Sequence, residues 1–187
     1  INTSGAGSES SLERAIADTT VKQYDYALRQ LDPQAPDYAE AAAQIQAERQ
    51  AFQIAECQQR TEKYATDLQI RFELGQLYFK AGKISEAIQE LQKAQANPHR
   101  RLQAMGYLGQ CFARRGMNDM AARTLQNAIK EKTAFDAEKK ELIYTLAGVL
   151  ERMNNKPEAF EQLKLIYEVD SGYKDVGPRV EAYYAGQ

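Results

Sequence analysis

The side chains that could carry covalent or metal chemistry are few and scattered along the chain. His99 is the only histidine among 187 residues, and it follows Pro98 in a stretch typical of a loop. Cys57 and Cys111 lie far apart without a CxxC pair, which argues against a zinc site or a disulfide framework. The sequence has neither a phosphate-binding Gly-rich loop nor an HExxH motif. We therefore predict a non-enzymatic protein with no cofactor and no metal, an exposed His99 and two reduced, packed thiols.

Side chains suited to non-covalent binding recur at fixed distances. Gln76 and Gln110 are separated by the same number of residues as Lys80 and Arg114. A third cation, Arg152, follows Arg114 at a slightly longer spacing in the sequence. Amides and long cations of this kind bind carboxylates and peptide backbone. Their recurrence predicts a repeated structural element that presents them on one surface.

The element that repeats is a pair of helices. The stretch FELGQLYFKAGKISEAIQELQKA, residues 72–94, returns at residues 106–128 as GYLGQCFARRGMNDMAARTLQNA. A third copy, containing YTLAGVLERMNNKPEAFEQLKLI, carries four extra residues, about one helical turn, which we expect to lengthen the helix that leads to Leu146. Gly75 and Ala87 are small where the two helices of a pair approach closest. The pairs that align with Gly75 and Gly109 are Leu74 with Leu108, Tyr78 with Phe112, Ala87 with Ala121, Leu91 with Leu125, and Ala94 with Ala128.

Turn chemistry separates the two helices of each copy. Gly82 and Gly116 can take the left-handed conformation that ends a helix, and Asn155 is expected to do the same in the third copy. Ser85 and Asn118 are predicted to cap the second helices of the first two copies. In the third copy, Pro157 suits the first turn of the second helix.

These residues make the chain similar to the tetratricopeptide repeat family, whose unit is an antiparallel helix pair of about 34 residues. The resemblance covers about residues 66–171 and departs from the family pattern at Arg71 and Met105, where Trp is usual. It implies an all-α solenoid in which the first helices line a concave groove that holds a peptide or a helix of a partner. The resemblance also suggests a bacterial protein of the kind in which such repeats form the C-terminal part of a longer chain.

The predicted groove residues share one side of each first helix or flank it. At 100° per residue, Gln69, Gln76 and Lys80 point in one direction, and the same positions recur in the next copies. We expect the groove to bind an acidic and apolar segment, with the alternative that the cations only solvate a helix surface. The clamp that holds acidic chaperone tails in some relatives is absent, because Phe72 and Gln76 replace its Lys and Asn. The predicted binding residues are Gln69, Phe72, Gln76, Phe79 and Lys80 in the first copy, Gln103, Tyr107, Gln110 and Arg114 in the second, and Tyr144 and Arg152 in the third.

The flanks are predicted to be helical as well. We expect a flexible leader at residues 1–7, two helices within residues 8–65, and a short capping helix within residues 172–187 that starts near Pro178. The repeats between these flanks span about residues 66–99, 100–133 and 136–171. An alanine stripe in the second N-terminal helix either packs on the first repeat as a cap or mediates self-association, which would make the chain a homodimer. The stripe consists of Ala39, Ala43, Ala47, Ala51 and Ala55.

Composition narrows the choice of partner. The chain has 24 basic and 26 acidic residues, so no strong overall field favours nucleic acid. A cluster of Arg100, Arg101 and Arg114 near Tyr107 leaves single-stranded RNA as a weaker alternative. The compartment is not fixed by the sequence, and the cytoplasm is favoured because no signal or membrane segment is visible. Because residue 1 is Ile, we expect a segment to precede it.

Overall fold

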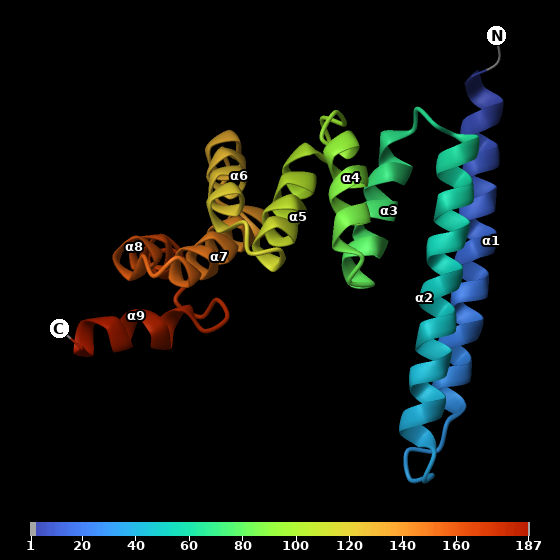
Figure 1. Ribbon diagram of the computed structural model, residues 1–187, viewed down its shortest axis with the longest axis horizontal. Helices are drawn as coiled ribbons and strands as arrows, with labels where there is room; N and C mark the ends of the chain where they lie inside the picture. The colour runs from blue at the N-terminus through green and yellow to red at the C-terminus, as the bar shows by residue number, and fades with distance from the viewer. Residues whose placement is uncertain (1–2, 187) are drawn as a thin grey trace.

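The computed structural model describes residues 3–186, which fold into nine α-helices without a strand (Figure 1). The predicted all-α class is confirmed. A long N-terminal hairpin precedes three shorter hairpins, and one helix follows them. The helices are α1 (Thr3–Gln30), α2 (Tyr38–Lys63), α3 (Leu68–Lys80), α4 (Ile84–Ala94), α5 (Arg101–Arg114), α6 (Asn118–Glu131), α7 (Ala137–Arg152), α8 (Lys156–Tyr167) and α9 (Val176–Ala185).

Each repeat is a pair of helices in direct contact, α3 with α4, α5 with α6 and α7 with α8. Glycine permits this approach in the first two pairs. A Cβ atom added to Gly75 would lie 2.7 Å from Cγ of Leu91, and one added to Gly109 would lie 2.6 Å from Cγ of Leu125. Both leucines are fully buried, so the core has no space for a larger side chain.

The turns within the hairpins share one backbone geometry. Gly82 and Gly116 have φ angles of 73° and 75°, and Asn154 takes this position in the third repeat with a φ of 60°. The prediction that Asn155 ends α7 is therefore wrong. Asn155 instead caps α8, because its side chain accepts a hydrogen bond from the Glu158 amide.

The predicted caps Ser85 and Asn118 are also wrong. The residue after the turn glycine, Lys83 or Met117, occupies the cap position without a side-chain hydrogen bond. Its amide already bonds back to the preceding helix, as Lys83 does to the Tyr78 carbonyl at 2.9 Å. The second helix therefore begins before Ser85, and Asn118 becomes its first helical residue.

The four extra residues before the third repeat are shared between elements. Helix α4 ends at Ala94, whereas α6 continues three residues beyond Ala128, the equivalent position. Helix α7 begins two residues earlier relative to Leu146 than α5 does relative to Leu108. The prediction that the insertion lengthens one helix is therefore corrected. Helices α6 and α7 are both longer than their equivalents α4 and α5, and the loop between α6 and α7 is one residue shorter than the loop between α4 and α5.

The N-terminal hairpin and the repeats form an arch (Figure 1). Helix α2 packs on both α1 and α3, and α9 packs on α8. Helix α1 begins at Thr3, earlier than the predicted start at residue 8, because extending a nucleated helix gains a hydrogen bond for each residue fixed. Part of the predicted leader, residues 1 and 2, lies outside the described residues. Pro178 lies in the first turn of α9.

The alanine stripe of α2 does not pack on the first repeat. All five alanines are exposed, and the buried residues of α2 are Ile54, Cys57, Arg60 and Thr61. Residues spaced by four advance about 40° around a helix at each step, so the stripe winds across the surface of α2. The helix still covers the first repeat, but through the face that carries Ile54 and Cys57.

Candidate binding groove

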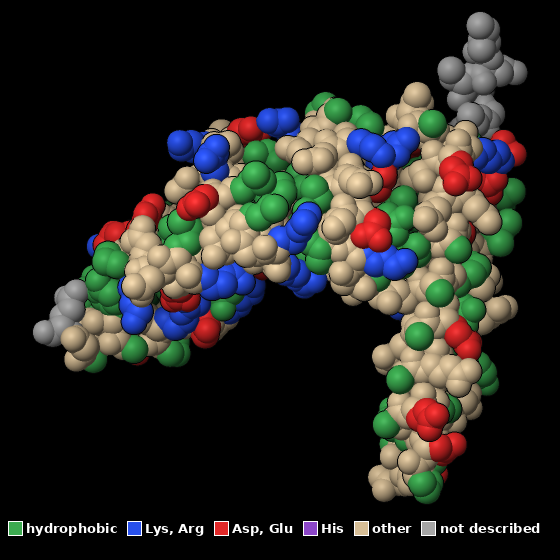
Figure 2. All heavy atoms as spheres, in the orientation of Figure 1, with side chains coloured by type: hydrophobic (Ala, Val, Ile, Leu, Met, Phe, Trp, Pro, Cys, Tyr) green, Lys and Arg blue, Asp and Glu red, His purple; other side chains and the backbone are tan. Residues whose placement is uncertain are grey.

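The first helices of the repeats line the inner side of the arch. Helix α3 contacts α5, and α5 contacts α7, whereas no contact joins α4 with α6 or α6 with α8 among the described residues. Helices on the inner side of a curved array lie closer together than those on the outer side. Lys and Arg side chains gather along the inner edge of the arch, over α3, α5 and the segment from α7 to α9 (Figure 2).

The three predicted cations stand near the C-terminal ends of α3, α5 and α7. Lys80, Arg114 and Arg152 are all exposed, and none of them pairs with a carboxylate of the described chain. The Arg114 guanidinium lies over the Phe79 ring at 3.9 Å and donates a hydrogen bond to the Phe79 carbonyl at 3.2 Å. This contact fixes the side chain and leaves its charge uncompensated.

Two adjoining hollows lie between α5 and α7. One has a volume of about 400 Å³ and the other about 480 Å³, and both are bordered by Gln110, Glu141 and Thr145. Small side chains deepen them: a Cβ added to Gly148 would meet no atom within 4 Å. The first hollow also contains Phe79, Leu102, Gln103, Gly106, Tyr107, Glu138 and Leu142, and the second contains Arg114, Tyr144, Gly148 and Arg152.

The predicted aromatic anchors are less accessible than the helical positions suggest. Phe72 and Phe79 are only 3% and 7% exposed, and both pack edge-on against the Tyr107 ring. The guanidinium of Arg100 lies over Phe72. Neighbouring first helices pack side by side, so these positions face the next repeat. Phe72 therefore supports the groove, while Phe79 and Tyr107 contribute to its surface.

Three of the four predicted amides are committed to the protein itself. Gln69 accepts a hydrogen bond from Arg100 at 2.7 Å, and Gln76 donates one to the Tyr107 hydroxyl at 3.1 Å. Gln103 accepts from Arg100 at 2.9 Å. Gln110 has no hydrogen-bond partner in the described part of the chain and borders both hollows.

The C-terminal segment caps the last repeat, as predicted. It also covers the third-repeat end of the groove, which the sequence did not predict. Tyr144 donates a hydrogen bond to Asp175 at 2.8 Å, and its ring lies edge-on to Tyr173. Tyr173 and Lys174 both donate to the Glu141 carboxylate. Tyr144, one of the predicted binding residues, is therefore covered by this segment. The segment has no equivalent in the repeats, so periodicity gave no signal for it.

This cover has an electrostatic consequence. Burial raises the pKa of the Glu141 carboxyl, but the hydrogen bonds from Lys174 and Tyr173 outweigh burial and hold the pKa below its usual value. Burial and the bond to Glu141 raise the pKa of Tyr173. Glu141 is therefore ionised and neutralised by Lys174, so it adds little repulsion toward an acidic ligand.

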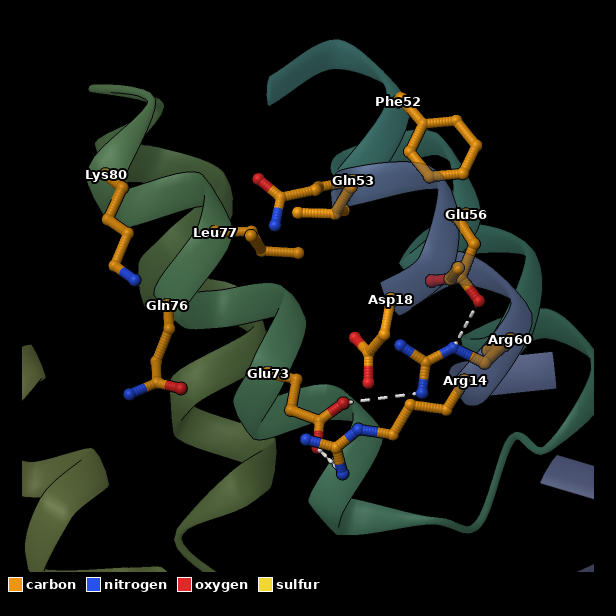
Figure 3. A pocket seen from close by; sticks show the side chains of 12 residues that line it. Arg14, Asp18, Phe52, Gln53, Glu56, Arg60, Glu73, Gln76, Leu77 and Lys80 are labelled. Atoms are coloured by element: carbon orange, nitrogen blue, oxygen red, sulfur yellow. Dashed lines mark hydrogen bonds and ion pairs between the residues drawn. The ribbon is translucent and has the colours of Figure 1, made fainter. Parts of the chain in front are cut away.

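At the other end, the groove meets the N-terminal hairpin in a cavity of about 180 Å³ between α1, α2 and α3 (Figure 3). Arg60, only 8% exposed, binds Glu56 at 2.6 Å and Glu73 at 3.3 Å. Arg14 of α1 reaches the same Glu73 at 2.9 Å. These ion pairs join the three helices and fix the hairpin against the first repeat.

The residues considered for chemistry lie elsewhere. His99 is exposed in a turn, as predicted. Cys57 and Cys111 are free and buried, and burial raises their pKa to about 12 and about 11. Among the described residues, no group of three or more His, Cys, Asp or Glu side chains is arranged to hold a metal. None of the described helices has the length and apolar character needed to span a membrane.

The arginines considered for RNA do not form an open cluster. Arg101 makes two hydrogen bonds to Glu131, at 2.8 and 3.0 Å. Arg100 is held by Gln69 and Gln103, and Arg114 by Phe79. Two of the three are thus bound by side chains of the protein, and Arg101 is the one of them that pairs with a carboxylate.

Comparison with solved structures identifies the fold. MamA superposes with a TM-score of 0.65 at 19% identity, over 78% of this chain and 82% of MamA. A thermophilic tetratricopeptide repeat protein of Thermus thermophilus gives 0.59 at 18% identity, over 95% and 96% of the two chains. A putative kinesin light chain of Podospora anserina with nearly identical repeats of this type gives 0.59 at 16%, over 88% and 93%. No family model and no curated protein sequence matches the chain. The chain therefore has the tetratricopeptide repeat fold that the resemblance implies.

Proposed function

We propose that this chain is a non-catalytic interaction or scaffold module whose concave surface binds an acidic, partly apolar segment of a partner protein. The observation that carries the proposal is the row of Lys80, Arg114 and Arg152, none of which pairs with a carboxylate of the described chain. Unpaired cations beside apolar hollows favour a ligand that brings carboxylates and apolar side chains together. The fold shared with other repeat proteins supports the same class of function.

The hollows between α5 and α7 support a specific division of roles. Phe79, Tyr107 and Leu142 offer apolar contact in one hollow, while Arg114 and Arg152 border the other. Gln110 lies between them and can donate to or accept from a peptide backbone. A segment with an apolar residue followed by an acidic one would meet these two environments in turn. Of the other predicted residues, Gln69, Phe72, Gln76, Gln103 and Tyr144 act by holding the groove in shape.

The test measures binding of a fluorescent helix-forming peptide that presents Glu and Leu on one face. A peptide with Gln in place of Glu serves as the neutral probe. We expect the acidic peptide to bind at least about tenfold more tightly than the neutral one, and added salt to weaken its binding. The triple variant Lys80→Ala, Arg114→Ala, Arg152→Ala should lose this preference.

A matched variant controls for the loss of three charges. Lys93, Arg123 and Lys156 are exposed on the second helices α4, α6 and α8, so their replacement by Ala removes the same charge from the outer side. This control should bind the acidic peptide like the wild type. Equal binding by both triple variants, with unchanged melting curves, would show that the groove cations only solvate the helix surface.

A further inference from the structure

Helix α1 carries two stripes with the spacing of a coiled-coil seam. The first contains Ala17, Val21, Tyr24 and Leu28, spaced by four and three residues in turn, and continues to Leu31 just beyond the end of the helix. It faces α2, as the contact of the Tyr24 ring with Phe52 at 6.1 Å shows. Such 3.5-residue spacing keeps a stripe against a neighbouring helix over many turns.

The second stripe has the same spacing but nothing of the described chain covers it. Three of the four large apolar side chains that are more than 60% exposed among the described residues lie on it: Leu12 at 63%, Ile16 at 61% and Tyr26 at 65%. Around the helix axis, the second stripe lies about 140° from the first. It borders a hollow of about 370 Å³ whose lining includes Ile16 and Phe52 of α2. Its members are Leu12, Ile16, Thr19, Gln23, Tyr26 and Gln30, all of which are exposed.

From residue 14 onward the charges of α1 avoid this exposed stripe, and the earlier Glu9 and Glu13 pair with Lys63 of α2. From residue 14 to residue 29, all charged residues fall within an arc of about 80° on another side of the helix. In a two-fold interface each surface meets its own copy, so a charged stripe would face like charges. A stripe without charge has no such cost, and the amides of Gln23 and Gln30 can pair with each other across it. The charged positions are Arg14, Asp18, Lys22, Asp25 and Arg29.

We propose that a second copy of this chain packs its α1 on the exposed stripe, so that two hairpins form a four-helix dimer. The geometry of the stripe agrees with this occupant. The stripe points about 140° away from the one that faces α2, so α1 alone forms the contact and pairs with α1 of the second copy. Its 3.5-residue spacing is the one with which two helices stay in contact along their length. The groove cations lie on α3, α5 and α7, so dimerisation leaves the proposed binding surface open.

The experiment determines the molar mass of the wild-type chain and of two variants by light scattering after size exclusion. The wild type should elute with twice the 21.1 kDa mass of one chain. Ile16→Glu places a charge in the stripe and should elute as a monomer. Val169→Glu is the matched control, because Val169 is equally exposed, at 64%, in the loop between α8 and α9, and it should remain a dimer.

A second variant guards against an effect of Ile16→Glu on folding. Gln23→Glu changes one atom of an exposed amide, and it should raise the dissociation constant of the dimer at least about tenfold while leaving the melting curve of the monomer unchanged. A monomeric wild type at about 100 μM would overturn the proposal. Equal dimerisation of Ile16→Glu and Val169→Glu would overturn it as well.

Discussion

At the residue scale, the smallest side chains carry the repeat. Glycine at positions 75 and 109 lets a leucine of the paired helix fill the space that a Cβ would occupy. Helical glycine is otherwise unfavourable because it loses more backbone entropy than alanine on folding. The structure contains both kinds of helical glycine. Packing requires the glycine at position 75 but not the one at position 148, so their substitutions can be compared directly.

We expect Gly75→Ala to destabilise the protein by about 1–3 kcal/mol, because its Cβ would overlap Leu91 in a closed core. Gly148→Ala is the matched control. It lies within α7 with open space around the added Cβ, so it should stabilise by about 0.5–1 kcal/mol. Urea unfolding followed by circular dichroism measures both changes. Two changes of the same sign would contradict this account of the glycines.

The cysteines give a second prediction at this scale. With pKa values of about 12 for Cys57 and about 11 for Cys111, both are protonated at pH 8, and the thiolate is the reactive form. We expect an aromatic disulfide reagent to label neither thiol in the native protein and both after addition of urea. Rapid labelling of the native chain at pH 8 would mean that the repeats open locally around these residues.

At the element scale, ion pairs set how the hairpin meets the first repeat. Arg60 of α2 is buried between Glu56 and Glu73. We expect Arg60→Ala to cost about 2–4 kcal/mol, because it leaves the half-buried Glu56 carboxylate without its cation, whereas Glu73 keeps its pair with Arg14. Lys63→Ala removes pairs with Glu9 and Glu13 that are solvent-exposed and should change stability little. Thermal unfolding of the two variants distinguishes a buried from a solvated contact, and equal losses would contradict this assignment.

The C-terminal cover should respond to acid. The folded-state pKa of Glu141 is lowered chiefly by Lys174 and Tyr173 against burial, and that of Asp175 chiefly by the hydrogen bond from Tyr144. A lowered pKa contributes stability above the unfolded value, about 4, and this stability is lost as pH falls through the folded value. The stability difference between the wild type and Glu141→Gln should thus be present at pH 7 and shrink as the pH falls below about 4 and through the folded-state pKa of Glu141. A difference that does not change with pH would show that the contacts do not depend on charge.

The sequence predicts elements well where its pattern is periodic. The three helix pairs follow from small residues and turns at one spacing, and Gly82 and Gly116 have the predicted conformation. The environment of individual side chains is less predictable. A helical projection places Phe72 beside the groove, but it cannot show that the next first helix covers it. The cover of Tyr144 by Asp175 joins residues 31 apart in sequence through a segment without a repeat, so no spacing could reveal it.

At the scale of the whole molecule, the arch combines a packed array with a projecting hairpin. The buried core runs from α2 through the repeats, and a second cluster joins α7, α8 and α9. The buried residues of α2 all lie between Ile54 and Thr61, and Ala17 is the only buried residue of α1 in its described part. The half of the hairpin near the loop at residues 31–37 is therefore held by contacts between α1 and α2 alone. A two-helix hairpin of this kind is marginally stable when nothing else covers it.

Amide hydrogen exchange should show this difference and test the dimer at the same time. Local stability follows buried apolar contact, so amides of α5, which is packed on both sides, should exchange slowest in every sample. In the monomeric variant Ile16→Glu, residues 38–50 should exchange much faster than α5, because only α1 covers these residues. In the wild type at high concentration the second copy would cover α1 and stabilise the whole hairpin by mass action, so exchange of these residues should slow as concentration rises. If residues 38–50 exchange equally fast in both proteins at every concentration, the exposed stripe of α1 faces solvent and the hairpin is a single-copy cap.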